Sequence, residues 1–425
     1  MPEINGKLKI VNWNVGGAKY LELRSRTSDR FDPPFSFCRQ RDCSVHERRR
    51  CDTKCREGFR KEVNDGLDYL INLPNGKPDI ITLQEVVRYE PHCHLPAAKD
   101  VIDPPGGYRW IPFWLIDTIK HGARGKWDKV RKNGGWPRNA FFAQGNAVLI
   151  RETDPIEDGI AYYPVLALPE RHQSRDRFRR KAPKRPFTRW DDPPVDDCME
   201  CVQLEPGMYF GDRDTEPRAT LVTHVVLSGP SEGGGGGMRE ELRKPLDVFV
   251  INLHLTTLTG EREGIPDTDE RAAQTRSRQL DTVLNKIVSM YNEWRRDHYR
   301  IRDKRYPVRK GMDTIERHPP IWVITGDFNF TPEAAEYQTM LRRGFIDLMP
   351  KRHMHGLAYH QLTKAQGPGK EPTITLDYVF AGPRLAALDP NDVERGIQGN
   401  TVNVDVKASD HYPLIVDLPI SIDET

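Results

Sequence analysis

The stretch IWVITGDFN, residues 321–329, combines the two features that decide the fold of this chain. It begins as a short, nearly continuous apolar run and ends on polar residues that include Asp327 and Asn329. A strand in which apolar and polar residues hardly alternate is typical of a sheet that is covered on both faces. The stretch therefore predicts a buried strand whose carboxyl end presents polar side chains.

Seven further segments have the same apolar character and are predicted to be strands. They are LKIVNWNV (8–15), DIITLQEV (79–86), NAVLI (146–150), ATLVTHVVL (219–227), DVFVINLHL (247–255), TLDYVFAG (375–382) and YPLIVDL (412–418). Helical patterns over residues 59–72 and 270–296 lie between them. Because strands and helices alternate along the chain, we expect an α/β or α+β class with about ten strands.

The composition is that of a globular chain with polar additions. Residues of the set AVILMFWYC make up 37% of the 425 residues, and charged residues make up 30%, against roughly 25% charged in an average soluble protein. The net charge is only +2, which excludes a uniformly basic nucleic-acid-binding protein but leaves local basic patches open. No apolar run approaches the roughly 18 residues of a membrane helix, and a signal peptide is not expected. We therefore expect a cytoplasmic protein, with the nucleus as an alternative.

Four segments differ in composition from the predicted strands and helices. They lie at about 24–57, which is rich in Cys and Arg, at 118–139 and 169–200, which are basic with Trp and Phe, and at 228–244, which contains GGGGG. No internal repeat or clean linker divides the chain. We therefore expect one domain spanning residues 1–425, with these four segments as insertions.

Polar side chains recur at the carboxyl ends of the predicted strands. Burial there costs free energy that a purely structural strand would avoid, and strand ends are where α/β proteins place their sites. We therefore predict a single convergent pocket. Its residues are Asn14, Glu85, His254, Asp327, Asn329, Asp377, Asp410 and His411.

The residue types in this pocket indicate a metal ion and a phosphate. Glu85, Asp327 and Asp410 offer oxygen ligands suited to a hard divalent ion such as Mg²⁺ or Mn²⁺. Asn14, Asn329 and two histidines add donors for phosphate oxygens. This combination fits hydrolysis of a phosphate ester, in which charge at the reacting phosphorus must be neutralised and a water activated.

The order of the motifs adds a resemblance to a known family. The series NWNV, LQEV, NLHL, GDFN, LDYVF and SDHYPL resembles the motifs of the endonuclease/exonuclease/phosphatase superfamily, the deoxyribonuclease I-like metal-dependent phosphodiesterases. Each motif alone is weak, but six in this order are specific. The resemblance covers residues 8–418 and implies a four-layer α/β/β/α sandwich of two mixed sheets.

The resemblance also implies roles for individual residues. Glu85 matches the main metal-ligand glutamate of the family, and Asn14 and Asp410 are expected to complete the metal and phosphate environment. Asp327 matches the aspartate that orients or deprotonates the attacking water. Asn329 matches the asparagine that holds the phosphate.

The two histidines are expected to act on the phosphate. His254 matches a phosphate-contacting histidine of the nuclease and sphingomyelinase branches. His411 is expected to pair with Asp377, which fixes its tautomer and favours its protonated form. Whether His411 or Asp327 is the general base stays open. Asn146 lies in a GNAVLI segment that resembles one near the substrate phosphate, and an ordinary structural role for it is equally open.

Two of the insertions contain strongly basic stretches with aromatic residues. Residues 171–190 contain nine Lys and Arg against one acid, Asp176, and residues 120–138 contain seven against Asp128. Such a run is usually a solvated loop, but two of them with interleaved aromatics are typical of a groove that follows a nucleic-acid backbone. The expected substrate-binding residues are Arg177, Arg179 and Arg180.

The cysteines of the first insertion are spaced C-x4-C-x7-C-x3-C. Four thiolates in a short insertion with little core of its own are able to hold a structural Zn²⁺. The spacing departs from the usual C-x2-C knuckles, so free thiols are the alternative. The candidate zinc ligands are Cys38, Cys43, Cys51 and Cys55.

These observations favour a Mg²⁺- or Mn²⁺-dependent phosphodiesterase, and more specifically a nuclease acting on DNA or RNA. The alternative is a sphingomyelinase-like or phosphoinositide-type lipid phosphoesterase, which would act on membrane lipid. A catalytically inactive binding module would require a broken motif, and none of the six is broken.

Overall fold

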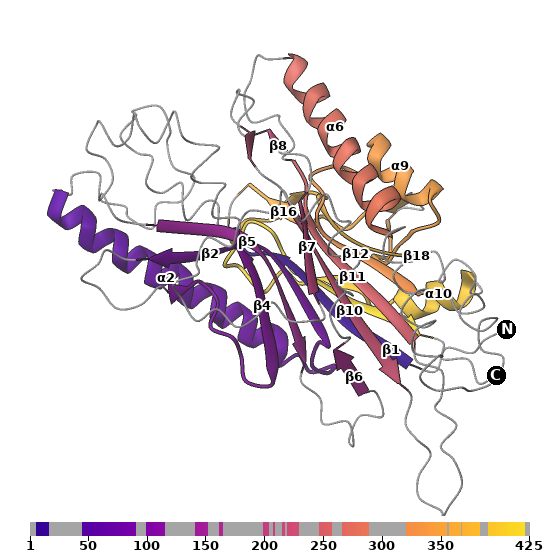
Figure 1. The fold of residues 1–425 in the computed structure, drawn as a ribbon, viewed down its shortest axis with the longest axis horizontal. Coiled ribbons are helices and arrows are strands. Elements are labelled where there is room, and N and C mark those ends of the chain that lie inside the picture. Colours follow the sequence, from indigo (N-terminus) through magenta and orange to yellow (C-terminus); the bar gives the residue numbers. More distant parts are fainter. Residues whose placement is uncertain are drawn as a thin grey trace, which may run out of the picture.

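The computed structural model describes fifteen segments of the chain, and two packed sheets form its centre (Figure 1). None of the helices within these segments is long and apolar enough to cross a membrane. The described residues are 6–16, 45–90, 99–114, 141–151, 161–164, 199–203, 207–208, 215–216, 219–228, 246–256, 266–288, 320–354, 357–366, 368–382 and 390–420.

The first sheet has seven strands in the order β19-β20-β1-β2-β5-β4, with β3 paired to β2. It is mixed, because β1 runs parallel to β2 but antiparallel to β20. Its strands are β1 (Gly6–Asn14), β2 (Ile80–Glu90), β3 (Lys99–Asp100), β4 (Tyr108–Trp114), β5 (Phe141–Arg151), β19 (Thr401–Val402) and β20 (Leu414–Ile420).

The second sheet also has seven strands, in the order β13-β18-β12-β11-β10-β6, with β7 paired to β10. It is mixed as well, because β11 runs parallel to β12 and antiparallel to β10. Its strands are β6 (Ala161–Pro164), β7 (Met199–Gln203), β10 (Ala219–Ser228), β11 (Leu246–His254), β12 (Ile321–Asp327), β13 (Ile346–Asp347) and β18 (Asp377–Gly382).

Three small hairpins complete the strands. They pair β8 (Gly207–Met208) with β9 (Thr215–Glu216), β14 (Arg352–Met354) with β15 (Leu357–Tyr359), and β16 (Lys364–Ala365) with β17 (Pro372–Ile374).

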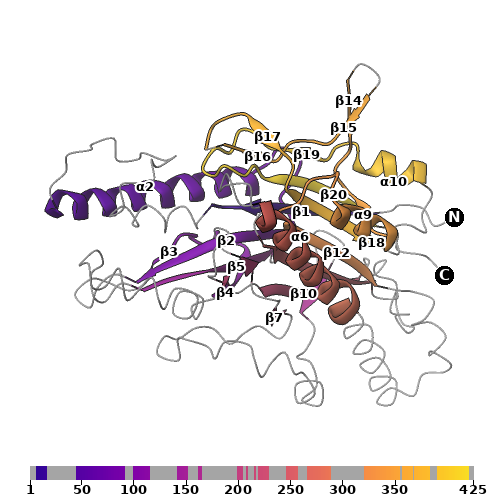
Figure 2. The same cartoon turned by 90° about the horizontal axis from the view of Figure 1, so that it is seen from above.

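Helices cover the two outer faces. Helix α2 (Val45–Ile71) packs on the first sheet, where Val63 and Leu67 join a cluster with Trp13. Helices α6 (Pro266–Asp281) and α9 (Ala335–Arg342) pack on the second, where Leu280 and Met340 join the cluster of that face. Figures 1 and 2 show α2 on one side of the sheets and α6 with α9 on the other. A π-helical segment (Thr282–Ile287) extends α6, and α10 (Pro390–Ile397) lies beside β20.

The remaining core lies between the sheets. Leu8, Ile10 and Ile80 of the first sheet share one buried cluster with Val250 and Val323 of the second. Both faces of each sheet are therefore covered, which explains the nearly continuous apolar runs. The predicted four-layer α/β/β/α sandwich of two mixed sheets is confirmed.

The helix predicted over residues 59–72 begins earlier than expected. It starts at Val45 and so takes up residues 45–57 of the predicted insertion 24–57. These residues are rich in Arg, Lys and Glu, which favour helix, and the apolar pattern alone does not reveal them. Most of the other three insertions, and the basic stretches in them, lie outside the described residues. The one-domain organisation stays a prediction.

Candidate active site

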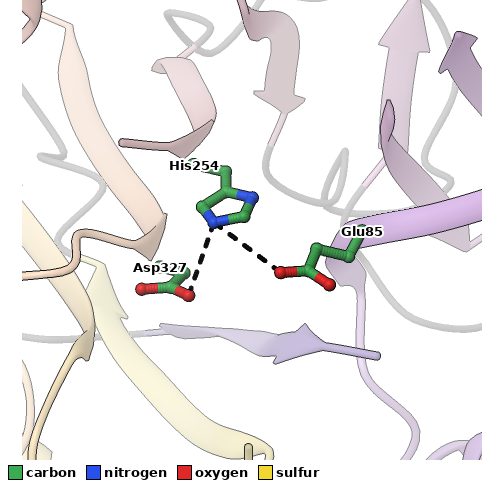
Figure 3. Close-up of side chains that lie close together, drawn as sticks. All are labelled: Glu85, His254 and Asp327. Carbon is green, nitrogen blue, oxygen red and sulfur yellow. Dashed lines mark ion pairs between the residues drawn. The ribbon is translucent and has the colours of Figure 1, made fainter. Parts of the chain in front are cut away.

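A β-bulge sets the direction of Glu85. Pairing between β2 and β5 shifts register so that Gln84 and Glu85 both lie opposite Asn146. Glu85 has φ 53°, in the left-handed region that residues with a side chain rarely adopt. A bulge breaks the alternation of side chains and re-aims one of them. The carboxylate of Glu85 consequently points toward the second sheet, where His254 and Asp327 lie (Figure 3).

Three neighbouring strands of the second sheet deliver acidic and imidazole groups in one row. His254 is the register partner of Asp327 across β11 and β12, and Asp327 is the partner of Asp377 across β12 and β18. Gly326 makes this approach possible, because a Cβ at Gly326 would lie 1.9 Å from the Leu253 carbonyl oxygen. The glycine of the GDFN motif is thus required by the close packing of the strands that carry the site.

Side chains of the first sheet contact His254 and Asp327 of the second sheet. Asn14 Nδ2 donates to Asp327 Oδ2 at 2.9 Å and to Glu85 Oε1 at 3.3 Å. His254 Nε2 lies 3.6 Å from Asp327 Oδ2 and 3.8 Å from Glu85 Oε1. Groups from both sheets therefore meet between Glu85 and Asp327 (Figure 3).

Asn329 follows β12 in a strained conformation. Its φ is 53°. Among the non-glycine residues of the described segments, only Asn329 and Glu85 have a positive φ. Its backbone N–H donates to Asp327 Oδ1 at 3.0 Å, and its Nδ2 donates to the Leu255 carbonyl at 3.2 Å. Such strain persists only where surrounding contacts hold it, and it is common at functional sites.

His411 is held in the pairing that the sequence predicts. Its Nδ1 lies 2.9 Å from Asp377 Oδ2, and its Nε2 lies 3.7 Å from Asp327 Oδ2. Thr363 fixes the acidic partner, because its hydroxyl donates to Asp377 Oδ2 at 2.7 Å and accepts from the Asp377 N–H at 3.1 Å. With Nδ1 engaged by Asp377, Nε2 is the nitrogen that faces the row of carboxylates.

Asp410 and Asn146 lie at the edges of this group. Asp410 is buried, and a Cβ placed on Gly16 would lie 3.6 Å from Asp410 Oδ1, so its side chain borders the turn after β1. That turn is held by the N–H of Gly16, which donates to Asn14 Oδ1 at 2.9 Å. Asn146 is buried opposite the β2 bulge.

Burial and neighbouring charges shift the pKa values of two central groups. Burial raises the pKa of Asp327; the positive charges of His411 and Lys364 oppose the shift, and the charge of Asp377 adds to it. Burial by itself lowers the pKa of His411, but the carboxylates of Asp377 and Asp327 outweigh it and raise that pKa to about 9. These shifts favour a protonated His411 beside the carboxylates.

The residues present fit a divalent cation. Ligand atoms of Glu85, His254 and Asp327 all lie within 4.8 Å of one another, and so do those of Asp327, Asp377 and His411. Burial, together with the negative charges of Asp377 and Glu85, raises the pKa of Asp327, and a cation bound beside these carboxylates would stabilise their charged forms. Oxygen-rich donors of this kind suit Mg²⁺ or Mn²⁺.

Some predicted residues cannot be placed in the site. Arg177, Arg179 and Arg180 lie outside the described residues, as do Cys38 and Cys43. The other two candidate zinc ligands, Cys51 and Cys55, belong to α2.

The sequence reasoning did not single out Thr363 or Lys364. Lys364 forms a backbone bridge with His411, and its charge acts on Asp327 as well as on that histidine. Both residues lie in QLTKAQ, away from the predicted strands, and only the β16 hairpin brings them to the site. No local pattern would have identified them.

The fold and the site define an α/β/β/α sandwich with a carboxylate and histidine cluster suited to a divalent cation. The sequence model of the Endonuclease/Exonuclease/phosphatase family matches residues 11–411, and the chain belongs to this family. Members of the family are hydrolytic phosphoesterases. A comparison with curated proteins found no match.

Solved structures similar to this chain include the following three. They are the human Nocturnin catalytic domain with bound sulfate (11% identity, covering 97% of this chain and 93% of that chain, TM-score 0.38), D. rerio TDP2 complexed with a single-strand DNA product (12%, 97% and 99%, 0.36), and ANGEL2, a 2′,3′-cyclic phosphatase, in complex with adenosine-2′,3′-vanadate (13%, 98% and 96%, 0.38). A likeness of this size carries no argument about function.

Proposed function

We propose that this chain is a Mg²⁺- or Mn²⁺-dependent phosphodiesterase that cleaves nucleic acid. The observation that carries the proposal is the meeting of Glu85, His254 and Asp327 from three strands of two sheets, with ligand atoms within 4.8 Å of one another. Buried charged groups are costly unless they are paired or bind metal. Their concentration at one end of the sandwich supports a site built for a cation and an anionic substrate.

In this proposal Glu85 holds the metal, with Asn14 and Asp410 beside it. When bound, the metal supplies charge neutralisation for the phosphate and lowers the pKa of a water. Asn14 also donates to Asp327 Oδ2, so one side chain orients both carboxylates.

The remaining residues handle the proton and the phosphate. Asp327 accepts hydrogen bonds from Asn14 and from the Asn329 N–H, which fixes the carboxylate to orient and deprotonate the attacking water. His411, with its raised pKa, donates through Nε2 to a phosphate oxygen. His254 and Asn329 contact the same phosphate group. The base in this scheme is therefore Asp327 and not His411.

The nucleic-acid substrate is supported by the sequence and not by the site geometry. The two basic stretches with interleaved aromatic residues, 120–138 and 171–190, fit a polyanionic backbone with stacked bases better than a lipid headgroup. A lipid phosphoesterase would use the same cluster, so the substrate has to be tested directly.

The test is incubation of the purified protein with duplex DNA, single-stranded DNA, RNA and sphingomyelin in the presence of Mg²⁺. We expect cleavage of a polynucleotide that EDTA abolishes and that Mg²⁺ restores. Asp327→Asn should lower kcat/KM by at least about 100-fold, because general base catalysis contributes roughly that much. Hydrolysis of sphingomyelin alone would favour the lipid alternative, and turnover that survives both EDTA and Asp327→Asn would contradict the proposal.

A further inference from the structure

A layer of buried amide and hydroxyl groups lies between the two sheets, beneath the candidate site. Asn12, Gln84 and Asn252 have no exposed surface, and neither have Thr82 and Thr325. Burying such groups costs free energy unless each is hydrogen-bonded. A layer of this kind at the site end of an otherwise apolar core needs a physical reason.

The most connected member is Asn252 of β11. Its Nδ2 donates to the carbonyl oxygens of Leu83 (3.0 Å) and Ala147 (2.8 Å), which belong to β2 and β5 of the opposite sheet. Because carbonyl oxygens only accept, the nitrogen of the amide must face them. Oδ1 accordingly faces Gln84, whose Nε2 donates to it at 2.8 Å.

These contacts surround the β2 bulge. Leu83 and Ala147 form the last register pair before the bulge, and Gln84 is its first residue. A bulge interrupts the hydrogen-bond ladder, so this part of β2 has fewer backbone bonds to define it than a regular strand. The two N–H groups of Asn252 supply bonds to both strands at the point of interruption.

The same side chain is tied to the strand that carries His254. Asn252 precedes His254 by two residues in β11, and its register partner is Thr325, two residues before Asp327. Gln84 Nε2 also donates to Asn12 Oδ1 at 2.8 Å. The layer thus links the backbone at the bulge to the strands that deliver the other groups of the cluster.

We propose that Asn252 is a positioning residue for Glu85: its amide holds the β2 bulge in place, and the bulge aims the carboxylate at His254 and Asp327. The strained φ of Glu85 persists because the residues before it are held from the opposite sheet. This inference rests on the proposed role of Glu85 as the metal ligand. Asn252 itself touches neither substrate nor metal.

The test measures Mn²⁺ binding to the protein without substrate, by electron paramagnetic resonance of the free ion. Wild type should bind Mn²⁺, and Glu85→Gln should bind it much more weakly. Asn252→Leu, of similar volume but unable to donate, should weaken binding roughly ten- to hundredfold, the usual effect of losing a group that orients a ligand. The matched control is Thr220→Val, which removes one buried bond to the Asn252 backbone carbonyl (2.8 Å), leaves the bonds of the Asn252 amide group in place, and should bind like wild type.

A second variant covers the case in which Asn252→Leu does not fold. Gln84→Met keeps the length of the side chain and removes both donated bonds, to Asn252 and to Asn12, so it should weaken Mn²⁺ binding about tenfold. The inference would be overturned if Asn252→Leu folds and binds Mn²⁺ with wild-type affinity. If Asn252→Leu does not fold, wild-type Mn²⁺ affinity in Gln84→Met would overturn it. A loss of Mn²⁺ affinity in Thr220→Val equal to that in the test variant would overturn it as well. A wild-type protein that binds no Mn²⁺ would instead overturn the proposed function, and the inference with it.

Discussion

Backbone strain is concentrated at two residues of the site. Glu85 and Asn329 carry positive φ values, each of which costs on the order of 1–3 kcal/mol. Asn329 is held by its bonds to Asp327 and Leu255, and Glu85 by the bulge. The orientation of the Glu85 and Asn329 side chains therefore costs the folded protein some stability.

The carboxylate of Asp347 in β13 lies outside the site, on the other side of β18 from β12. It accepts from the Met349 N–H at 3.0 Å and from the Tyr337 hydroxyl at 3.1 Å, and its side chain is only 8% exposed. Burial raises its pKa to about 6, although both hydrogen bonds oppose the shift. Unlike Asp327, Asp347 has no place in the proposed mechanism.

Replacing Asp347 with Asn should change how stability depends on pH. The unfolded carboxyl has a pKa of about 3.9, so between about pH 4 and pH 6 the folded state binds the proton more tightly and the free energy of unfolding falls as pH rises. The Asp347→Asn variant lacks this loss of stability. Its free energy of unfolding should be higher than that of wild type by up to about 2–3 kcal/mol at pH 7, and the difference should shrink toward pH 4. Urea unfolding at several pH values measures it, with Asp68→Asn on the exposed face of α2 as the control. A pH-independent difference would contradict the assignment.

Two glycines of α2 separate helix propensity from packing at the scale of the element. A Cβ on Gly58 would meet nothing within 4 Å, whereas one on Gly66 would lie 2.8 Å from Val406 Cγ1 and 3.2 Å from the Trp13 ring. Helix α2 therefore packs closely at Gly66 against Trp13 of β1 and against Val406. Trp13 is not free to yield, because it is fully buried and its indole donates to the His411 carbonyl at 3.1 Å.

Gly58→Ala should raise the free energy of unfolding by about 0.5–1 kcal/mol, because alanine loses less conformational freedom in a helix than glycine. Gly66→Ala gains the same helix propensity, but its methyl group crowds the contact between α2 and Trp13. We expect it to lower the free energy of unfolding by about 1–3 kcal/mol. Denaturant unfolding of the two variants makes the comparison. Equal stabilisation by both would show that α2 does not pack closely on the sheet at Gly66.

At the scale of the whole molecule, substrate choice is expected to depend on the basic insertion. Replacing Arg177, Arg179 and Arg180 with Ser should weaken polynucleotide binding and reduce the slope of log affinity against log salt by about 0.7–0.9 for each lost phosphate contact. Titrations at several salt concentrations measure both quantities. An equal loss of turnover on bis-(4-nitrophenyl) phosphate would mean that the segment supports the fold, and unchanged polynucleotide affinity would favour a lipid substrate.

The cysteine cluster predicts a second kind of metal site. If Cys38, Cys43, Cys51 and Cys55 bind Zn²⁺, elemental analysis of protein purified without added metal should find about one zinc per chain. Cys51→Ser should release the zinc and expose residues 24–57 to proteases, while the two sheets stay folded. Activity should still need added Mg²⁺ or Mn²⁺. Metal-free protein with four titratable thiols would leave these cysteines without a metal role.

Patterns local to the sequence indicated strands buried on both faces and named the residues at the strand ends, whereas the four layers were implied by the resemblance to the family. Apolar runs such as that before Asp327 reflect burial on both faces of a strand, and burial is recorded in the residues themselves. The same runs end in the polar residues that now meet, including Glu85 and His254. A pattern of a few residues is enough to predict each strand, because every strand must be apolar on both faces to be buried, whatever its neighbours are.

Only the tertiary structure decided how those strand ends are aimed. The β2 bulge and the positive φ of Glu85 depend on the pairing of β2 with β5, and the bonds donated by the Asn252 amide join residues 105 and 169 positions apart. No short pattern exists for contacts at such separations. The hydroxyl of Thr363 reaches Asp377 only through the β16 hairpin. Register and cross-sheet hydrogen bonds are set by packing the two sheets together, because packing selects among backbone arrangements that the local sequence permits equally.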